Sequence, residues 1–215
     1  MSTKIAVLVS GSGRGSNMQA ILDGCEAGMI DGGVVVVIGT KTDAPALNRA
    51  AQAEAPTVVA SPRCFATDEE YGAVLLHQLE RFQVDLVCLA GYMRILPAAV
   101  VKVYRNRVMN IHPALLPAFG GKGMYGRHVH EAVLESGAKY SGCTVHFVDE
   151  HYDTGPIIVQ RVVPVHDGDD ADTLAARILE QEHQAYVEAV KLFCENRLVF
   201  KGRRVIVLPA TKAGI

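Results

Sequence analysis

Two features are scarce in this 215-residue sequence: paired cysteines and an excess of charge of either sign. The five cysteines are widely spaced and include no C-x-x-C pair, which gives no basis for a disulfide framework or a zinc knuckle. The 21 basic and 23 acidic residues leave a formal charge of −2, which argues against nucleic acid as the main partner. We therefore expect cytosolic thiols in a chain that does not bind nucleic acid.

Long hydrophobic runs are also missing. The longest candidate, "VVVVI" at 34–38, falls far short of the roughly 18 residues that a membrane span needs, and it fits a buried strand. The N-terminus "MSTKIAVLVSG" enters a strand pattern without the charged head, apolar stretch and cleavage site of a signal peptide. These absences predict a cytoplasmic protein with no membrane partner, and the 49% hydrophobic content predicts an ordinary globular core.

What the sequence does contain is an alternation of β-rich apolar runs with stretches of helical period. Strands are expected at 4–10, 33–39, 57–60, 84–91, 142–148, 156–165 and 203–208. Helices are expected at 16–28, 46–54, 67–82 and 169–197. Thr67 and Glu70 form a capping-box pattern at the third helix. The alternation predicts an α/β fold with a doubly wound, mostly parallel sheet and an antiparallel extension, in a single domain.

Ligands in such sheets bind beyond the carboxyl ends of the strands, so motifs that follow strands are candidate sites. "SGSGRGSN" at 10–17 follows the first strand and opens a helix, where glycines let the backbone approach an anion and N–H groups are free. Its G-x-G-x-G spacing is not that of a dinucleotide site, and no Walker-type G-K-[ST] is present. The motif favours binding of a single phosphate, with Ser16 or Asn17 capping the helix. The alternative is a glycine-rich turn that only connects the strand to the helix.

"NIHPALLP" at 110–117 places an amide and an imidazole two residues apart before two prolines. In an extended segment Asn110 and His112 point the same way, and Pro113 favours extended geometry at His112. The two side chains can therefore face one pocket. A strand end that enters a proline-rich turn, with His112 hydrogen-bonded in the core, is the alternative interpretation.

"GCTVHFVDEHYDTGP" at 142–156 offers a partner for that imidazole. Thr144 and His146 share one face of a strand, and Asp153 sits in a turn, where it could simply bind turn amides. If Asp153 instead reaches His112, it raises the pKa of the imidazole and favours a cation. Asn110 and a charged His112 would then be two donors for a developing oxyanion.

"AGYMRILP" at 90–97 follows the fourth expected strand. Met93, Ile95 and Leu96 could form the apolar wall of a pocket for a flat heterocycle. The alternative is a loop with Arg94 in solvent and Pro97 starting a helix.

Taken together, "SGSGRGSN", "MRIL", "NIHPALLP", "GCTVHFV", "DTGPII" and "QEH" occur in the order and rough spacing of the folate-dependent formyltransferases. The chain resembles this family from Lys4 to about Asn196. The resemblance implies a Rossmann-like formyltransferase fold, 10-formyltetrahydrofolate as co-substrate, and no metal.

Within the family, these motifs leave open formylation of glycinamide ribonucleotide in purine synthesis, formylation of methionyl-tRNA, and hydrolysis of formylfolate. From the chain length we expect no C-terminal barrel domain like that of the tRNA enzyme, and from the start at the first strand we expect no N-terminal regulatory domain like that of the hydrolase. "GSN" at 15–17 also resembles the ribonucleotide branch. We therefore expect the ribonucleotide and formylfolate as small-molecule substrates of a monomer or homodimer. Hydrolysis and a non-catalytic nucleotide-binding module are the alternatives.

By matching position, the resemblance implies that Asn110, His112 and Asp153 are catalytic. It assigns the folate to Met93, Arg94, Ile95, Leu96, Asn110, Asp149, Glu150, His151, Tyr152 and Asp153. It assigns the ribonucleotide to Gly15, Ser16, Asn17 and Glu182. The N-terminal half of the domain would mainly bind the ribonucleotide phosphate, and the C-terminal half would mainly bind folate and carry the catalytic residues.

Two positions depart from the family pattern. The glycine motif is two residues longer than the commoner "SGxGSN", which affects which amides contact phosphate, and Asp68 stands where many relatives carry a basic residue that contacts folate, with Arg63 nearby. The segment "GGKGMYGRHVHEA" at 120–132 predicts a glycine-rich lid with Lys122 near the phosphate. Its histidines are not expected to bind metal.

Overall fold

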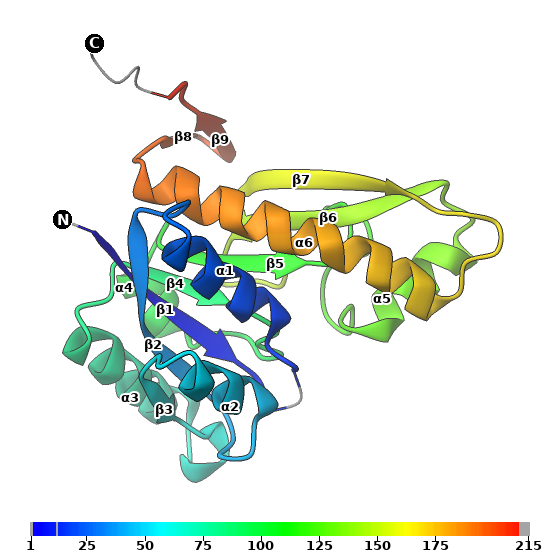
Figure 1. The fold of residues 1–215 in the computed structure, drawn as a ribbon. Coiled ribbons are helices and arrows are strands. Elements are labelled where there is room, and N and C mark those ends of the chain that lie inside the picture. Colours follow the sequence, from blue (N-terminus) through cyan, green and yellow to red (C-terminus); the bar gives the residue numbers. More distant parts are fainter. Residues whose placement is uncertain (1, 12, 211–215) are drawn as a thin grey trace.

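The computed structural model describes residues 2–11 and 13–210, so Ser12 of the glycine motif lies outside the described residues. Its centre is a seven-stranded sheet in the order β3-β2-β1-β4-β5-β6-β7 (Figure 1). The strands are β1 (Thr3–Val9), β2 (Gly32–Gly39), β3 (Thr57–Val59), β4 (Leu86–Leu89), β5 (Val108–His112), β6 (Tyr140–Phe147) and β7 (Ile157–Pro164). The first five strands are parallel, and the pairs β5–β6 and β6–β7 are antiparallel, so β6 runs opposite to the other six. The predicted fold class is confirmed.

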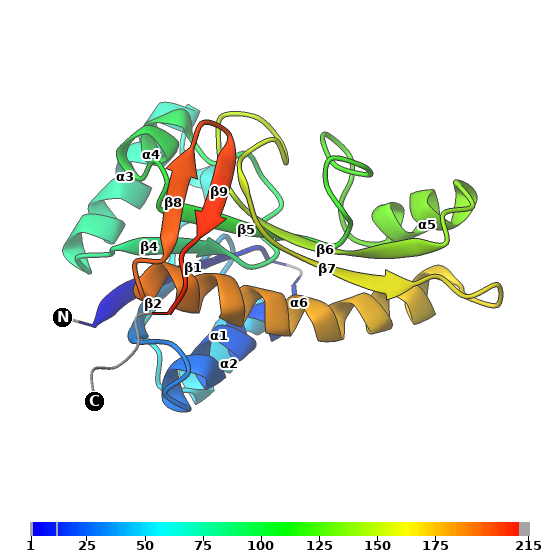
Figure 2. The ribbon, with the colours of Figure 1, turned by 90° about the horizontal axis from the view of Figure 1, so that it is seen from above.

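Helices cover both faces of this sheet (Figure 2). One face packs against α1 (Ser16–Glu26), α2 (Pro45–Gln52) and α6 (Ala171–Cys194). The other packs against α3 (Asp68–Arg81) and α4 (Ala98–Val103). Residues Ile5 to Val9 of β1 are fully buried, because alternate side chains enter the two layers. This burial on both faces explains the continuous apolar runs in the sequence.

Of the two predicted helix caps, the structure contains the one at α3 in part and lacks the one at α1. Thr67 Oγ1 accepts from Glu70 N at 3.2 Å as expected, but the Glu70 carboxylate accepts from Ala66 N, one residue before the cap. The prediction that Ser16 or Asn17 caps α1 is wrong. Gly15 holds the capping position at φ 77°, with no side-chain cap, and the Asn17 amide instead donates to Glu182.

The helix at Pro97, which the sequence offered only in the alternative interpretation, is present as α4. Sequence patterns missed three further short elements. These are the 3₁₀ turn η1 (Pro62–Cys64), helix α5 (Arg127–Glu135), inside the segment expected as a lid, and strand β8 (Leu198–Lys201). Strand β8 forms a hairpin with β9 (Arg204–Val207) (Figure 2). The hairpin packs through Phe200 against Phe147, with ring centroids 4.9 Å apart. Within the described ranges, no helix is both long and apolar enough to cross a membrane.

Candidate active site

The carboxyl end of β5 carries two of the predicted catalytic side chains. In the antiparallel register, Asn110 pairs with His146 and His112 pairs with Thr144 of β6. Side chains of directly paired residues lie next to each other on one face. Asn110, His112 and His146 line a cavity of about 420 Å³ beyond the ends of β4 and β5. The strand pairing therefore builds the polar end of this cavity.

His112 is almost fully buried and has one fixed proton position. Its Nε2 lies 2.8 Å from the carbonyl oxygen of Phe119, which can only accept, so Nε2 carries a hydrogen. Its Nδ1 lies 3.6 Å from Oδ2 of Asp153. Burial lowers the pKa of His112 more than Asp153 and the Phe119 carbonyl raise it. The expectation of a raised pKa is therefore wrong, because desolvation of the cation outweighs the nearby carboxylate.

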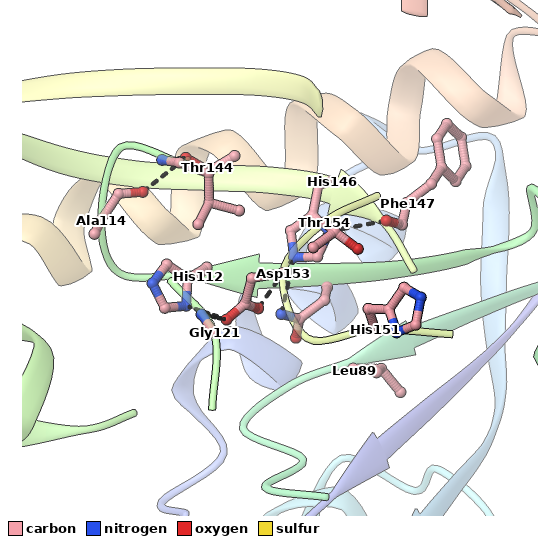
Figure 3. A network of polar contacts seen from close by, with 12 residues as sticks. Leu89, His112, Ala114, Gly121, Thr144, His146, Phe147, His151, Asp153 and Thr154 are labelled. Atoms are coloured by element: carbon pink, nitrogen blue, oxygen red, sulfur yellow. Dashed lines mark hydrogen bonds and ion pairs between the residues drawn. The ribbon is translucent and has the colours of Figure 1, made fainter. Parts of the chain in front are cut away.

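The Asp153 carboxylate lies between the rings of His112 and His146 (Figure 3). Its backbone adopts a left-handed conformation at φ 55°, which aspartate tolerates better than most residues. Oδ2 accepts from Gly121 N at 2.9 Å, and Oδ1 lies 3.6 Å from His146 Nε2. Burial alone would raise the pKa of the Asp153 carboxyl, yet His146, His112 and the Gly121 N–H together hold it below its usual value. The carboxylate is therefore ionised near neutral pH.

His146 is the participant to which sequence reasoning assigned no role. Its Nδ1 donates to the Phe147 carbonyl at 2.8 Å, so Nε2 of the neutral ring is an acceptor. The Asn110 amide nitrogen lies 3.2 Å from that Nε2 and donates to it. One N–H of Asn110 is thus used to fix the amide, and the second is available to a substrate. The alternation of polar side chains in "GCTVHFV" was the available signal.

Thr144 fixes the proline turn that follows His112. Its hydroxyl donates to the Ala114 carbonyl at 2.7 Å and accepts from Leu116 N at 3.0 Å. Both bonds are buried, so the turn is tied to the neighbouring strand on each side of Leu115. The backbone that directly follows His112 is thereby held in place.

The predicted folate residues lie together around the same cavity. Nine of the ten line it: Met93, Arg94, Ile95, Leu96, Asn110, Asp149, His151, Tyr152 and Asp153. Glu150 does not line it. Met93 and Ile95 are each 47% exposed, so apolar surface is available at the cavity wall. Lys122 lines the cavity as well, and Arg94 pairs with Asp68 at 3.3 Å on its rim. The roles of these residues stay predictions.

The residues predicted to bind the ribonucleotide form a separate cluster at the start of α1. The Asn17 amide donates to Glu182 at 2.7 Å, while Asn17 Oδ1 is buried without a partner among the described residues. Burial raises the pKa of Glu182, and the Asn17 hydrogen bond opposes this. One turn further along α6, the Tyr186 hydroxyl contacts the carbonyls of Leu89 and Met109. Glu182 therefore lies near the carboxyl ends of the central strands.

This arrangement suits acyl transfer between two small molecules. An amide and an imidazole that face one cavity can stabilise an oxyanion, and an ionised carboxylate beside the imidazole favours its protonation. Among the described residues, no group of three or more histidine, cysteine, aspartate or glutamate side chains is placed to hold a metal ion.

Comparisons with known proteins agree with this reading of the geometry. The formyl transferase family model matches residues 3–190. A phosphoribosylglycinamide formyltransferase of Escherichia coli (strain K12) is 42% identical over 194 residues, covering 90% of this chain and 88% of that protein. A crystal structure of glycinamide ribonucleotide transformylase 1 from Symbiobacterium toebii matches with a TM-score of 0.91 and 46% identity, covering 96% and 94% of the two chains.

A chloroplastic phosphoribosylglycinamide formyltransferase of Vigna unguiculata is 47% identical over 201 residues. The match covers 92% of this chain but only 63% of that protein, so the chain spans less than two thirds of this relative's length.

Proposed function

Because this chain belongs to the formyl transferase family, we propose that it transfers the formyl group of 10-formyltetrahydrofolate to the amine of glycinamide ribonucleotide. The products are formylglycinamide ribonucleotide and tetrahydrofolate, a step of purine synthesis. The observation that carries the proposal is the convergence of Asn110, His112 and Asp153 on one cavity. The acceptor substrate is inferred from the names of the relatives.

The reaction breaks the bond between the formyl carbon and N10 of the folate and forms a bond from that carbon to the ribonucleotide amine. Attack by the amine gives a tetrahedral intermediate with a negative oxygen. The free N–H of Asn110 and a proton on Nδ1 of His112 are the donors for that oxygen. The attacking nitrogen loses one proton and N10 gains one, so no net proton is consumed.

His112 is neutral before the substrates bind, because burial lowers its pKa. A negative oxygen beside the ring favours the cation in the same way that Asp153 does. Protonation therefore follows the charge that develops during the reaction. Asp153 stays ionised and positions the ring, and its contact with His146 links it to the Asn110 amide.

The phosphate of the ribonucleotide binds at the start of α1, in the N-terminal half of the domain. Gly15 leaves the first turn of this helix without a side-chain cap, so the N–H groups of the Ser16 region are free for an anion. Asn17 and Glu182 then hold the glycinamide part, using the buried Asn17 Oδ1 and the second carboxylate oxygen as acceptors. The folate occupies the cavity formed by the C-terminal half and the Met93–Leu96 segment.

The test is formyl transfer from 10-formyltetrahydrofolate, measured with and without glycinamide ribonucleotide. Consumption of formylfolate that needs the ribonucleotide, with formylglycinamide ribonucleotide as product, is the expected result. Release of formate without the amine would instead identify a formylfolate hydrolase. Ribonucleotide binding without turnover would identify a nucleotide-binding module.

A further inference from the structure

The hairpin of β8 and β9 reaches back to the loop that carries Asp153, although it has no part in the proposed function. Its two strands are joined by a two-residue turn, since Lys201 pairs with Arg204. Gly202 holds the first position of this turn at φ 60°, the pattern of a type II′ turn, and Arg203 holds the second. Figure 2 shows the tip of the hairpin beside the loop between β6 and β7.

A charged hydrogen bond joins this tip to the loop. Nη2 of Arg203 donates to the backbone carbonyl oxygen of Thr154 at 2.5 Å. Because the guanidinium carries a positive charge, such a bond is stronger than one between two neutral groups. Thr154 directly follows Asp153, so the bond fixes the chain at the residue next to the carboxylate assigned to the reaction.

The hairpin is a firm support for this bond. Phe200 packs against Phe147, the last residue of β6, with ring centroids 4.9 Å apart. Leu208 N donates to the Arg197 carbonyl at 2.8 Å, and Arg197 Nε donates to the Leu208 carbonyl at 2.7 Å, which closes the base of the hairpin. The hairpin is therefore held against the sheet, and its tip presents Arg203 at a defined place.

The turn at Asp153 needs such a support. Asp153 adopts a left-handed conformation at φ 55°, which a residue other than glycine keeps only where its surroundings hold it. The Thr154 hydroxyl donates to the Asp149 carboxylate at 2.6 Å, which ties the turn to the start of its own loop. The bond from Arg203 ties the same residue to an element outside the loop.

We propose that Arg203 is a positioning residue for Asp153: by holding the Thr154 carbonyl, it keeps the Asp153 carboxylate between His112 and His146. Arg203 does not line the folate cavity, so it acts through the turn and not on the substrates. The inference rests on the proposed function, because it needs Asp153 in formyl transfer.

A cation that binds an anionic ligand is the competing interpretation of Arg203. Two surface grooves, of about 580 and 530 Å³, are both lined by this side chain. Two further cations and the carboxylates of Asp149 and Glu150 line the second groove, so its charges nearly balance. The bond to Thr154 therefore explains the placement of Arg203 better than an anion site does.

The first test measures the position of Asp153 and needs no turnover. The Gly121 N–H donates to the Asp153 carboxylate at 2.9 Å, so its hydrogen exchange reports whether the carboxylate stays in place. In substrate-free Arg203→Ala, exchange of this amide, followed by NMR, should be about fivefold faster than in the wild-type protein, the effect of one hydrogen bond. Arg204→Ala removes the same charge from the next residue, which is also exposed, and should leave the exchange rate unchanged.

The second test is formyl transfer by the same variants. In Arg203→Ala, kcat/KM for 10-formyltetrahydrofolate should fall by about fivefold while KM for the ribonucleotide is unchanged, because the turn belongs to the folate cavity. A less firmly held Asp153 stabilises the cation of His112 less. The apparent pKa of His112 in the pH profile of kcat should therefore move to lower pH, the direction that full loss of the Asp153 charge gives. Arg204→Ala should keep the wild-type rate and profile.

Each other outcome overturns the inference. Unchanged exchange at Gly121, or an unchanged kcat/KM, in Arg203→Ala would show that Arg203 does not position Asp153 for the reaction. Equal changes in Arg204→Ala would reduce the effect to net charge, and a slower rate with an unmoved pH profile would leave only a structural contact. If the wild-type protein does not transfer formyl groups, the proposed function fails, whereas exchange at Gly121 still tests the position of Asp153. The two failures are therefore distinguishable.

Discussion

Oδ2 of Asp153 lies 3.6 Å from Nδ1 of His112, and the opposite nitrogen of the ring donates to a carbonyl at 2.8 Å. Because that carbonyl holds the Nε2 proton, Nδ1 is the position that gains and loses a proton. A proton on Nδ1 is stabilised by the charge of the nearby carboxylate. The charge of His112 therefore depends on Asp153, although burial keeps the ring neutral at rest.

Asp153→Asn should preserve the fold and lower turnover. The amide oxygen can still accept from Gly121 N, but the charge that favours protonation of His112 is gone. We expect kcat to fall by about 10²- to 10⁴-fold, the usual contribution of a positioned acid–base system. Asp167→Asn, which removes a carboxylate 93% exposed to solvent, is the matched control. Steady-state kinetics across pH check the prediction, and a wild-type rate with an unmoved profile would remove Asp153 from the mechanism.

Asn110→Ala should act on turnover more than on binding. Loss of one preorganised oxyanion donor costs about 10²- to 10³-fold in kcat. His146→Phe removes the acceptor that orients the amide and the ring nitrogen beside Asp153, but leaves Asn110 and His112 in place, so its effect should be smaller and in the same direction. Single-turnover rates and folate titrations separate the two quantities. If Asn110→Ala binds folate very poorly yet reacts normally once bound, the residue serves binding and the oxyanion role is wrong.

The sheet could be predicted because it rests on local patterns, whereas most of the cavity residues were implied by the resemblance of the motifs to a known family. Apolar runs buried on both faces identify parallel strands, as in β1, and the two-residue spacing of Asn110 and His112 survives in β5. Helix α5 was missed because glycines up to Gly126 conceal where its short apolar repeat begins. Strand β8 was missed because its four residues follow the long helix almost without a break.

Features that depend on burial or on contacts between distant segments could not be predicted from the sequence. The pKa of His112 is lowered because the fold removes the ring from water, a quantity that no motif encodes. The role of His146 depends on which residue of β5 stands opposite it, which is set by strand register. The expected cap of α1 failed because Asn17 has a better partner 165 residues away, in Glu182.

Burial of His112 should also affect stability against pH. Its folded pKa lies below the ordinary value of 6.5, so the unfolded chain binds more protons between the two values. The stability that the neutral His112 contributes is fully present above the pKa of the unfolded chain, and it is lost as the pH falls toward the pKa of the folded protein. When the pH is lowered from about 7 to about 5, the free energy of unfolding should therefore fall less in His112→Gln than in the wild-type protein. Urea titrations at each pH measure the free energy of unfolding of both proteins. An equal or steeper fall in the variant would mean that His112 is charged in the folded protein.

Glu182→Gln should weaken binding of the ribonucleotide selectively. The glutamine can still accept from Asn17 and avoids burying a charge, so stability should be unchanged or higher. Loss of a charged acceptor should raise KM for the ribonucleotide about tenfold or more, with KM for folate unchanged. Glu180→Gln, two residues away on the exposed side of α6, is the control. A change in folate KM alone would place Glu182 in the other site.

Gly15 requires care as a probe of the phosphate site. It stands at φ 77°, and a Cβ there would lie 2.8 Å from Cβ of Ala46, so any larger residue strains the fold as well as the anion site. A Cβ on Gly13 would meet nothing closer than Ser10 Oγ at 3.9 Å. Gly13→Ala is therefore the substitution in this loop that the fold tolerates, and its effect on ribonucleotide affinity can be read without a folding defect.

The uncapped start of α1 should make the phosphate essential for efficient use of the acceptor. A phosphate-free glycinamide riboside has the same nucleophilic amine but no group that binds the free N–H groups after Gly15. Its kcat/KM should therefore be lower than that of the ribonucleotide by about 10²-fold or more. This is the loss expected when a charged hydrogen-bond partner and a helix-dipole contact are both removed. Inorganic sulfate should compete with the ribonucleotide and not with folate, because only the former uses this anion site. Initial-rate kinetics with each substrate varied distinguish the two patterns. Equal efficiency with the riboside, or sulfate inhibition competitive with folate, would move the phosphate away from α1.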